Sequence, residues 1–183
     1  MITKNLSNLL YSIIFIGFFL PAALAFTGKI DDGIIEKSKV SYINGSPKQM
    51  ILTSIPRKTK SYNFEGREFF CHQGNFFMLE DKKYIQIFPP SGLEVKEMTD
   101  YERIIKGGQV VYFLNGIFYY KKPKQKEFIV TYGPIGSQIY KLPKNAEKVK
   151  IEGEEFYAYY KAVFKATPTR SRDMYTLVGY IGD

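Results

Sequence analysis

Cys71 and His72 are the one cysteine and the one histidine of the chain, and they stand side by side. A thiol next to an imidazole could form the nucleophile and base of a Cys-His enzyme. The segment around them has strand-like sequence, however, and neighbouring side chains of a strand point to opposite faces. The imidazole is then badly placed to take the proton of the thiol. We therefore expect Cys71 to be a small buried apolar side chain and His72 to contact solvent near a hairpin corner.

Three pairs of adjacent acidic residues could instead supply a general acid and a general base. They are Asp31-Asp32, Glu80-Asp81 and Glu154-Glu155. The first two pairs fall in a leader and a turn, and the third alternates across the start of a strand, so we expect solvated charges. No nucleophile-elbow, phosphate-loop, zinc-histidine or calcium-loop spacing occurs. We expect no catalytic residue, no metal and no cofactor.

Lysines and tyrosines of the second half are better candidates for a site. Between Lys121 and Lys150, eight lysines stand against two glutamates, a net charge of +6. Such a run is either a solvated face that discourages edge pairing or a patch for an anionic envelope polymer or acidic lipid headgroups. Adjacent aromatic residues of a strand place one ring on each face of the sheet. Either both faces are covered by other parts of the protein, or one face presents its rings to sugars or to partner strands. The candidate binding residues are Lys121, Lys122, Lys124, Lys126, Tyr119, Tyr120 and Tyr140.

The first 25 residues have the pattern of a secretory signal peptide. Lys4 gives a positive start, residues 9–20 form a largely apolar run of twelve, and Ala23-Leu24-Ala25 supplies a small-residue cleavage site. Twelve helical residues extend roughly 18 Å, short of the ~30 Å hydrocarbon core of a membrane. We expect cleavage after Ala25, no later transmembrane span, and a periplasmic or secreted location. Without Lys4 the chain keeps 25 basic and 18 acidic residues, a net charge of +7.

A repeat of about 43 residues runs through the rest of the chain. Gly66 and Gly74 each belong to a strand-like aromatic segment, and both recur 42 residues later, as Gly108 and Gly116. A second set of markers keeps nearly the same period. It consists of three prolines separated by 43 and 44 residues, Pro47, Pro90 and Pro134. Two sets of markers in phase indicate a duplicated segment.

Each repeat has the pattern of antiparallel β-structure. In the second one, 110–114 is β-branched and aromatic, Asn115-Gly116 is the strongest two-residue hairpin signal, and 117–120 leads back. The one helix candidate, 99–106, aligns with strand residues of the next repeat. We expect an all-β fold of tandem short meanders, forming small barrels or one continuous sheet stack. The expected parts are the signal peptide (1–25), a leader with edge strands (26–54) and three β-repeats (55–97, 98–141 and 142–183).

Within these repeats, short motifs recur that combine glycine, proline and paired aromatic residues. The densest matches are Gly116-Ile117-Phe118-Tyr119, Gly133-Pro134-Ile135-Gly136, Leu142-Pro143 and Phe156-Tyr157, and Ile55-Pro56 extends the pattern backward. They resemble the motifs of an uncharacterised family of exported bacterial proteins, known as a domain of unknown function. The chain departs from that pattern at Gly133 and Met98, where the family has proline. The resemblance implies an envelope or secreted location and carries no catalytic residues.

These observations favour a non-enzymatic exported module that binds envelope polymer through a surface rich in lysine and tyrosine. The alternative is a structural or protein-interaction module that docks a partner by its edge strands or exposed rings. A secreted enzyme is the third class. Nucleic acid would suit the charge, but the export signal argues against it, and the sequence leaves the oligomeric state open.

Overall fold

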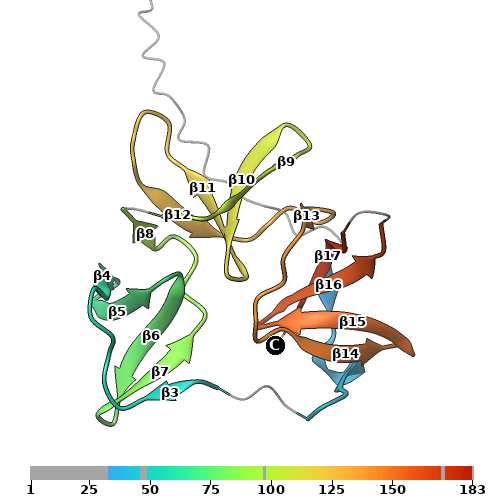
Figure 1. Ribbon diagram of the computed structural model, residues 1–183, viewed down its shortest axis with the longest axis horizontal. Coiled ribbons are helices and arrows are strands. Elements are labelled where there is room, and N and C mark those ends of the chain that lie inside the picture. The colour runs from blue at the N-terminus through green and yellow to red at the C-terminus, as the bar shows by residue number, and fades with distance from the viewer. Residues whose placement is uncertain (1–32, 46–48, 97, 170–171, 183) are drawn as a thin grey trace, which may run out of the picture.

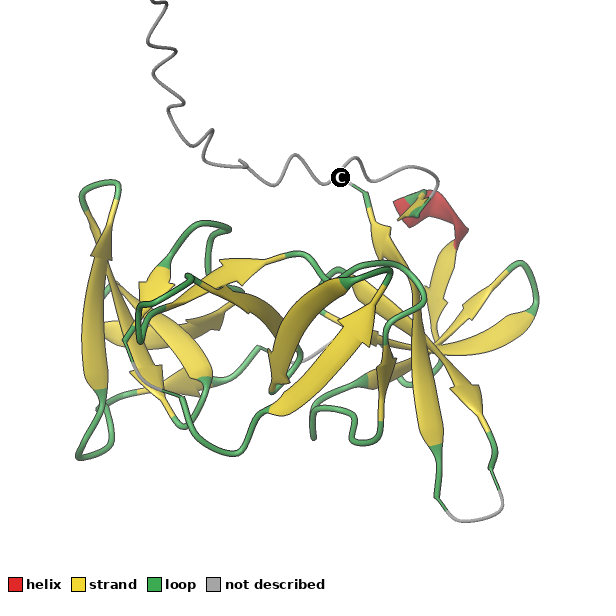
Figure 2. Cartoon of the chain, turned by 90° about the horizontal axis from the view of Figure 1, so that it is seen from above, coloured by secondary structure: helices red, strands yellow, loops and turns green. Residues whose placement is uncertain are grey.

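The computed structural model describes residues 33–45, 49–96, 98–169 and 172–182, and the expected signal peptide lies outside these ranges. All regular structure in them is β, apart from one 3-10 turn, η1 (Lys37–Lys39). This turn lies beside the sheet formed by the C-terminal strands of the chain (Figure 2). The described ranges hold no helix with the length and apolarity to cross a bilayer. The expected all-β class is confirmed.

The strands form three separate sheets rather than one continuous stack. The first sheet contains β3 (Ile51–Leu52), β4 (Lys60–Phe64), β5 (Arg67–His72), β6 (Asn75–Glu80) and β7 (Lys83–Ile87). The second contains β8 (Glu94–Val95), β9 (Glu102–Lys106), β10 (Gln109–Leu114), β11 (Ile117–Lys121) and β12 (Phe128–Thr131). The third contains β13 (Gln138–Ile139), β14 (Glu147–Ile151), β15 (Glu154–Tyr159), β16 (Ala162–Thr167) and β17 (Met174–Ile181), together with β1 (Ile34–Ile35) and β2 (Val40–Tyr42).

One strand order is repeated in all three sheets. The last four strands of each repeat form an antiparallel meander, and the short first strand returns to pair with the last one, as in β8-β12-β11-β10-β9. The two edge strands of a repeat are therefore consecutive along the chain. In the third sheet β1 and β2 are the edges, joined through η1, and the sheet is a nearly closed barrel (Figure 1). The sheets start at β8 and β13, a few residues ahead of the expected repeat starts at 98 and 142.

The hairpin predicted at Asn115-Gly116 joins β10 to β11. Both residues have positive φ, 47° and 83°, as a type I′ turn requires. The same turn at Gln73-Gly74 has φ values of 49° and 77°. The segment 99–106, the one helix candidate, contains β9 and pairs with β10. Local turn chemistry therefore repeats along with the strand order.

The second sheet contributes to two cores, and the side chains of its strands alternate between them. From β10, Val111 and Phe113 pack in a cluster with Phe164 and Leu177 of the third sheet. Tyr112, one position away in the strand, packs instead in the cluster that includes side chains of the first sheet. The adjacent aromatic pairs of this repeat serve two cores because both faces of its sheet are covered.

The turns between the third and fourth strands of the repeats lie next to one another. Asn115 Nδ2 donates a hydrogen bond to Gln73 O at 2.6 Å, which joins the second repeat to the first. Gly116 lies against the ring of Tyr159 in the third repeat. Tyr160 packs on Phe88 of the first repeat, with ring centroids 5.4 Å apart, so the third repeat also contacts the first. The three sheets are thus arranged around a common centre (Figure 1).

We expect Gly116→Ala to destabilise the protein more than the loss of a turn glycine alone would. A Cβ at this position would overlap the Tyr159 ring and lie 2.9 Å from Cγ of Pro143. The matched control is Gly108→Ala, because Gly108 also has positive φ, 78°, and a methyl group on its Cα would meet nothing within 4 Å. In the control, the strained positive φ should lower the free energy of unfolding by about 1–2 kcal/mol. In Gly116→Ala, overpacking should lower it by about 1–3 kcal/mol more. Urea unfolding measures both, and equal losses would contradict the close approach.

A second prediction concerns Tyr180, whose side chain is 6% exposed. Its hydroxyl donates to Gly133 O at 3.0 Å and accepts from Gly133 N at 2.6 Å. Tyr180→Phe leaves the buried N–H and C=O of Gly133 without the hydroxyl they bond to. We therefore expect the free energy of unfolding to fall by about 1–3 kcal/mol. Tyr132→Phe is the control, because its ring touches Tyr180 but the side chain is 37% exposed. A Tyr180→Phe protein as stable as the control would refute this role.

Candidate functional site

The predicted lysines lie at the end of the β11–β12 hairpin. Lys122 forms an ion pair with Glu94, and this hydrogen bond raises the pKa of the lysine. Among the described residues, the other three form no ion pair, and all three are exposed. We name Lys121, Lys124 and Lys126 the hairpin lysines.

The predicted tyrosines do not form one site with these lysines. Tyr120 is 36% exposed on β11, near Lys122. Tyr119 is 1% exposed, so its ring belongs to the core and not to a surface platform. Tyr140 is 46% exposed but lies elsewhere, with its N–H donating to Glu102 Oε2 at 3.0 Å and the Arg172 guanidinium 3.4 Å above its ring. The structure therefore groups the hairpin lysines with Tyr120 alone.

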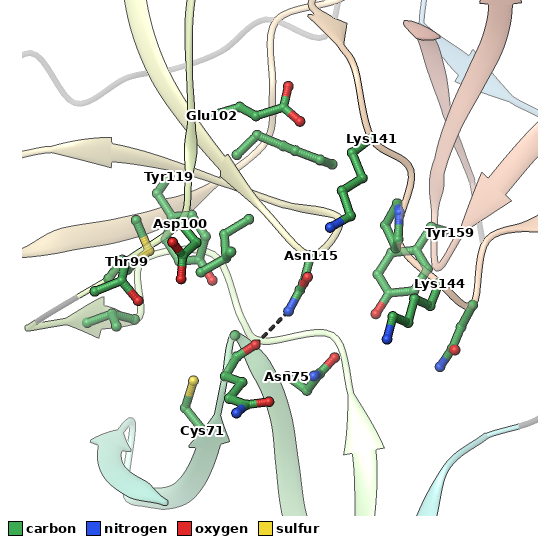
Figure 3. A pocket seen from close by; sticks show the side chains of 18 of the residues that line it. Cys71, Asn75, Thr99, Asp100, Glu102, Asn115, Tyr119, Lys141, Lys144 and Tyr159 are labelled. Carbon is green, nitrogen blue, oxygen red and sulfur yellow. Dashed lines mark hydrogen bonds between the residues drawn. The ribbon is translucent and has the colours of Figure 1, made fainter. Parts of the chain in front are cut away.

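A cavity that the sequence did not indicate opens between the three sheets. We name it the junction cavity; its volume is about 690 Å³ (Figure 3). All three repeats contribute to its walls. Its charged and amide side chains are Lys58, Lys60, Lys141, Lys144, Asp100, Glu102, Gln73, Asn75, Asn115 and Asn145. No single repeat contains the cavity, so no motif within a repeat could have revealed it.

Charges of both signs line the junction cavity. Lys141 and Lys144 lie on the side of the third repeat, across from Asp100 of the second (Figure 3). In the part of the chain that the structure describes, neither of these lysines forms an ion pair, and nor does Lys58. The cavity is therefore a polar space with unneutralised cations at its edge.

The neutral polar groups of the cavity are held in place by hydrogen bonds. The side-chain amide of Gln86, a residue 5% exposed, donates to Asn75 Oδ1 at 3.3 Å and to the Tyr159 hydroxyl at 3.4 Å. Burial raises the pKa of Tyr159, and that of Tyr119 even more, so both hydroxyls stay protonated and can donate. The arrangement offers hydrogen bonds and charge to a ligand.

Cys71 lines the same cavity, but its thiol is not activated. Burial raises the pKa of Cys71 to about 11, outweighing a backbone hydrogen bond from Gly74 and the charge of Lys60. His72 follows it in β5, where alternation directs the two side chains to opposite faces. Within the described ranges, no three side chains of His, Cys, Asp or Glu gather in a way that could hold a metal. Glu154, from one of the acidic pairs, is engaged with Lys165 at 2.7 Å.

The raised pKa of Cys71 predicts slow alkylation. At pH 8 the native thiol should react with iodoacetamide roughly a hundredfold more slowly than the same thiol in guanidinium-unfolded chain, because its thiolate fraction is that much smaller. The native rate should rise with pH up to about 11, whereas that of the unfolded chain should level off near 9. Mass spectrometry of the time course measures both rates. Equal rates at pH 8 would show that burial does not protect this thiol.

Comparison with known proteins agrees with the resemblance found in the motifs. No curated protein and no solved structure matches the chain. A family model described as a family of unknown function (DUF6515) matches residues 41–180, a range that runs from β2 into β17 and thus extends over all three repeats. The chain therefore belongs to the family of unknown function DUF6515.

Proposed function

We propose that the protein is a non-enzymatic exported module that binds an anionic polymer of the cell envelope through its β11–β12 hairpin. The observation that carries the proposal is the group of hairpin lysines, exposed and without ion pairs among the described residues, next to the half-exposed Tyr120. The expected signal peptide would bring the chain to the compartment that holds such polymers. The net charge of +7 after cleavage would favour the encounter.

The chemistry of the hairpin suits a polymer better than a compact anion. A lysine ammonium is a mobile point charge on a flexible stem, whereas arginine offers a planar fork for bidentate recognition. Single exposed charge pairs contribute little, about 0–1 kcal/mol each. A repeating anion can engage several lysines at once, so its weak contacts add through multivalency.

A second candidate function is docking of a partner chain at a sheet edge. β9 is one of the two edge strands of the second sheet, and it lines a groove of about 540 Å³ together with residues of β13 and its flanking loops. Ile105 of β9 lines this groove and is 61% exposed. An extended peptide could add a strand at such an edge. A partner held this way would depend on backbone hydrogen bonds rather than on the hairpin lysines.

The proposal predicts salt-sensitive retention on purified envelope polymers. We expect the mature chain to sediment with peptidoglycan sacculi or lipopolysaccharide at about 50 mM NaCl and to be released by about 500 mM. The variant Lys121→Ser/Lys124→Asn/Lys126→Ser should be lost from the pellet at the low salt concentration. Asparagine is chosen at position 124 because Lys124 has a left-handed φ of 62°.

A charge-matched variant of the first repeat, Arg67→Ser/Lys82→Asn/Lys83→Ser, is the control. It removes the same three charges from exposed positions away from the hairpin, so it should sediment like the unaltered chain. If both variants lose binding equally, net charge alone explains the retention and the hairpin is not the site. If the amount of protein that sediments changes neither with salt nor in either variant, docking at the sheet edge is favoured.

A further inference from the structure

We infer that the junction cavity is a second binding site, and that it takes a short saccharide bearing a carboxylate. The inference is separate from the proposed hairpin function, because the two places share no residue. The volume of about 690 Å³ falls in the usual range for small-molecule sites, about 300–1,000 Å³. The cavity also lies at the meeting point of the three repeats, where the hydrogen bond from Asn115 to Gln73 and the approach of Gly116 to Tyr159 hold the walls together.

Equivalent positions of the three repeats carry different chemistry at this cavity. Two residues before the second strand of each repeat stand Lys58, Asp100 and Asn145. All three line the cavity. The duplicated backbone therefore brings a cation, an anion and an amide together around one space, which gives the cavity an internal polarity that a symmetric packing would lack.

The cations select a carboxylate. Lys141 and Lys144 approach the cavity from the segment that follows β13, and Lys58 approaches from the first repeat. These three have no ion-pair partner among the described residues, so a bound carboxylate would meet ammonium groups that are not already neutralised. Charge-assisted hydrogen bonds of this kind are about twice as strong as neutral ones.

The remaining walls suit sugar rings. The amides of Asn75 and Asn145 and the hydroxyl of Tyr159 can bond to sugar hydroxyls, and Asp100 can accept from them. Asn75 and Tyr159 are already positioned by Gln86, which lowers the cost of ordering them around a ligand. Apolar side chains that line the same cavity, Leu114, Leu142 and Pro143, can pack against the C–H faces of a ring.

Two disaccharides that differ by one carboxylate-bearing group test the inference. The probes are N-acetylglucosaminyl-N-acetylmuramic acid, which carries a lactyl carboxylate, and its neutral counterpart N,N′-diacetylchitobiose, called chitobiose below. Calorimetric titration of the mature chain should show binding of the acidic probe and binding of chitobiose weaker by about tenfold or more, the effect of one charged hydrogen bond. Failure of the acidic probe to bind, or equal binding of the two probes, overturns the inference.

Variants then place the binding. Lys141→Ser/Lys144→Ser changes two exposed side chains, so the fold should persist, and circular dichroism checks this. This variant should bind the acidic probe with about tenfold lower affinity and bind chitobiose with unchanged affinity. The control Lys124→Asn/Lys126→Ser should bind both probes as the unaltered chain does. If only the control variant stops binding the acidic probe, the saccharide binds at the hairpin and the inference is overturned.

Sedimentation with sacculi separates the two proposals. The cavity variant should still sediment at low salt through its hairpin lysines, while the hairpin variant should not. If neither variant affects sedimentation but the cavity variant loses the acidic disaccharide, the hairpin proposal fails and the cavity site stands. If sedimentation depends on the hairpin but no disaccharide binds, the cavity inference fails and the hairpin proposal stands.

Discussion

The arrangement of the three sheets depends on the absence of a Cβ at Gly116. This residue has to satisfy two conditions together, a φ of 83° in a tight hairpin and contact with the ring of Tyr159. Glycine meets both, because it has no side chain to strain the turn or to displace the ring. The preceding residue, Asn115, then reaches Gln73 of the first repeat. One two-residue turn thus touches both neighbouring repeats.

The same arrangement explains why the chain is so rich in aromatic residues. A sheet that is covered on both faces, as the second sheet is, needs large apolar side chains at consecutive positions, not at alternate ones. Phe118 packs toward the third sheet and Tyr119 toward the first, and both are at most 2% exposed. Most adjacent rings therefore belong to the structure of the protein. Of the three tyrosines predicted as binding residues, Tyr120 and Tyr140 are exposed, and they lie at different places.

The fold was largely predictable because its signals are local. Asn115-Gly116 is a turn by its own chemistry, and a period near 43 residues reports a duplication whatever the copies pack against. The position of Tyr119 was not predictable in the same way. Strand alternation assigns its ring to one face, but whether that face is covered depends on Phe69 and Phe76, residues of another repeat. The junction cavity was hidden for the same reason, since Lys58, Asp100 and Asn145 lie far apart in the sequence and meet only through packing between repeats.

A site between repeats has a physical advantage over a site within one. The strands of each meander pair with one another, and the residues just before its second strand lie outside these pairs, so their side chains can change without breaking a strand pair. Lys58 and Asp100 occupy such equivalent positions with nearly equal φ values, 65° and 61°, although their charges are opposite. The backbone of the repeat thus tolerates either sign of charge there. Because three copies converge, different side chains at one repeated position can build a polar, asymmetric cavity on a nearly symmetric scaffold.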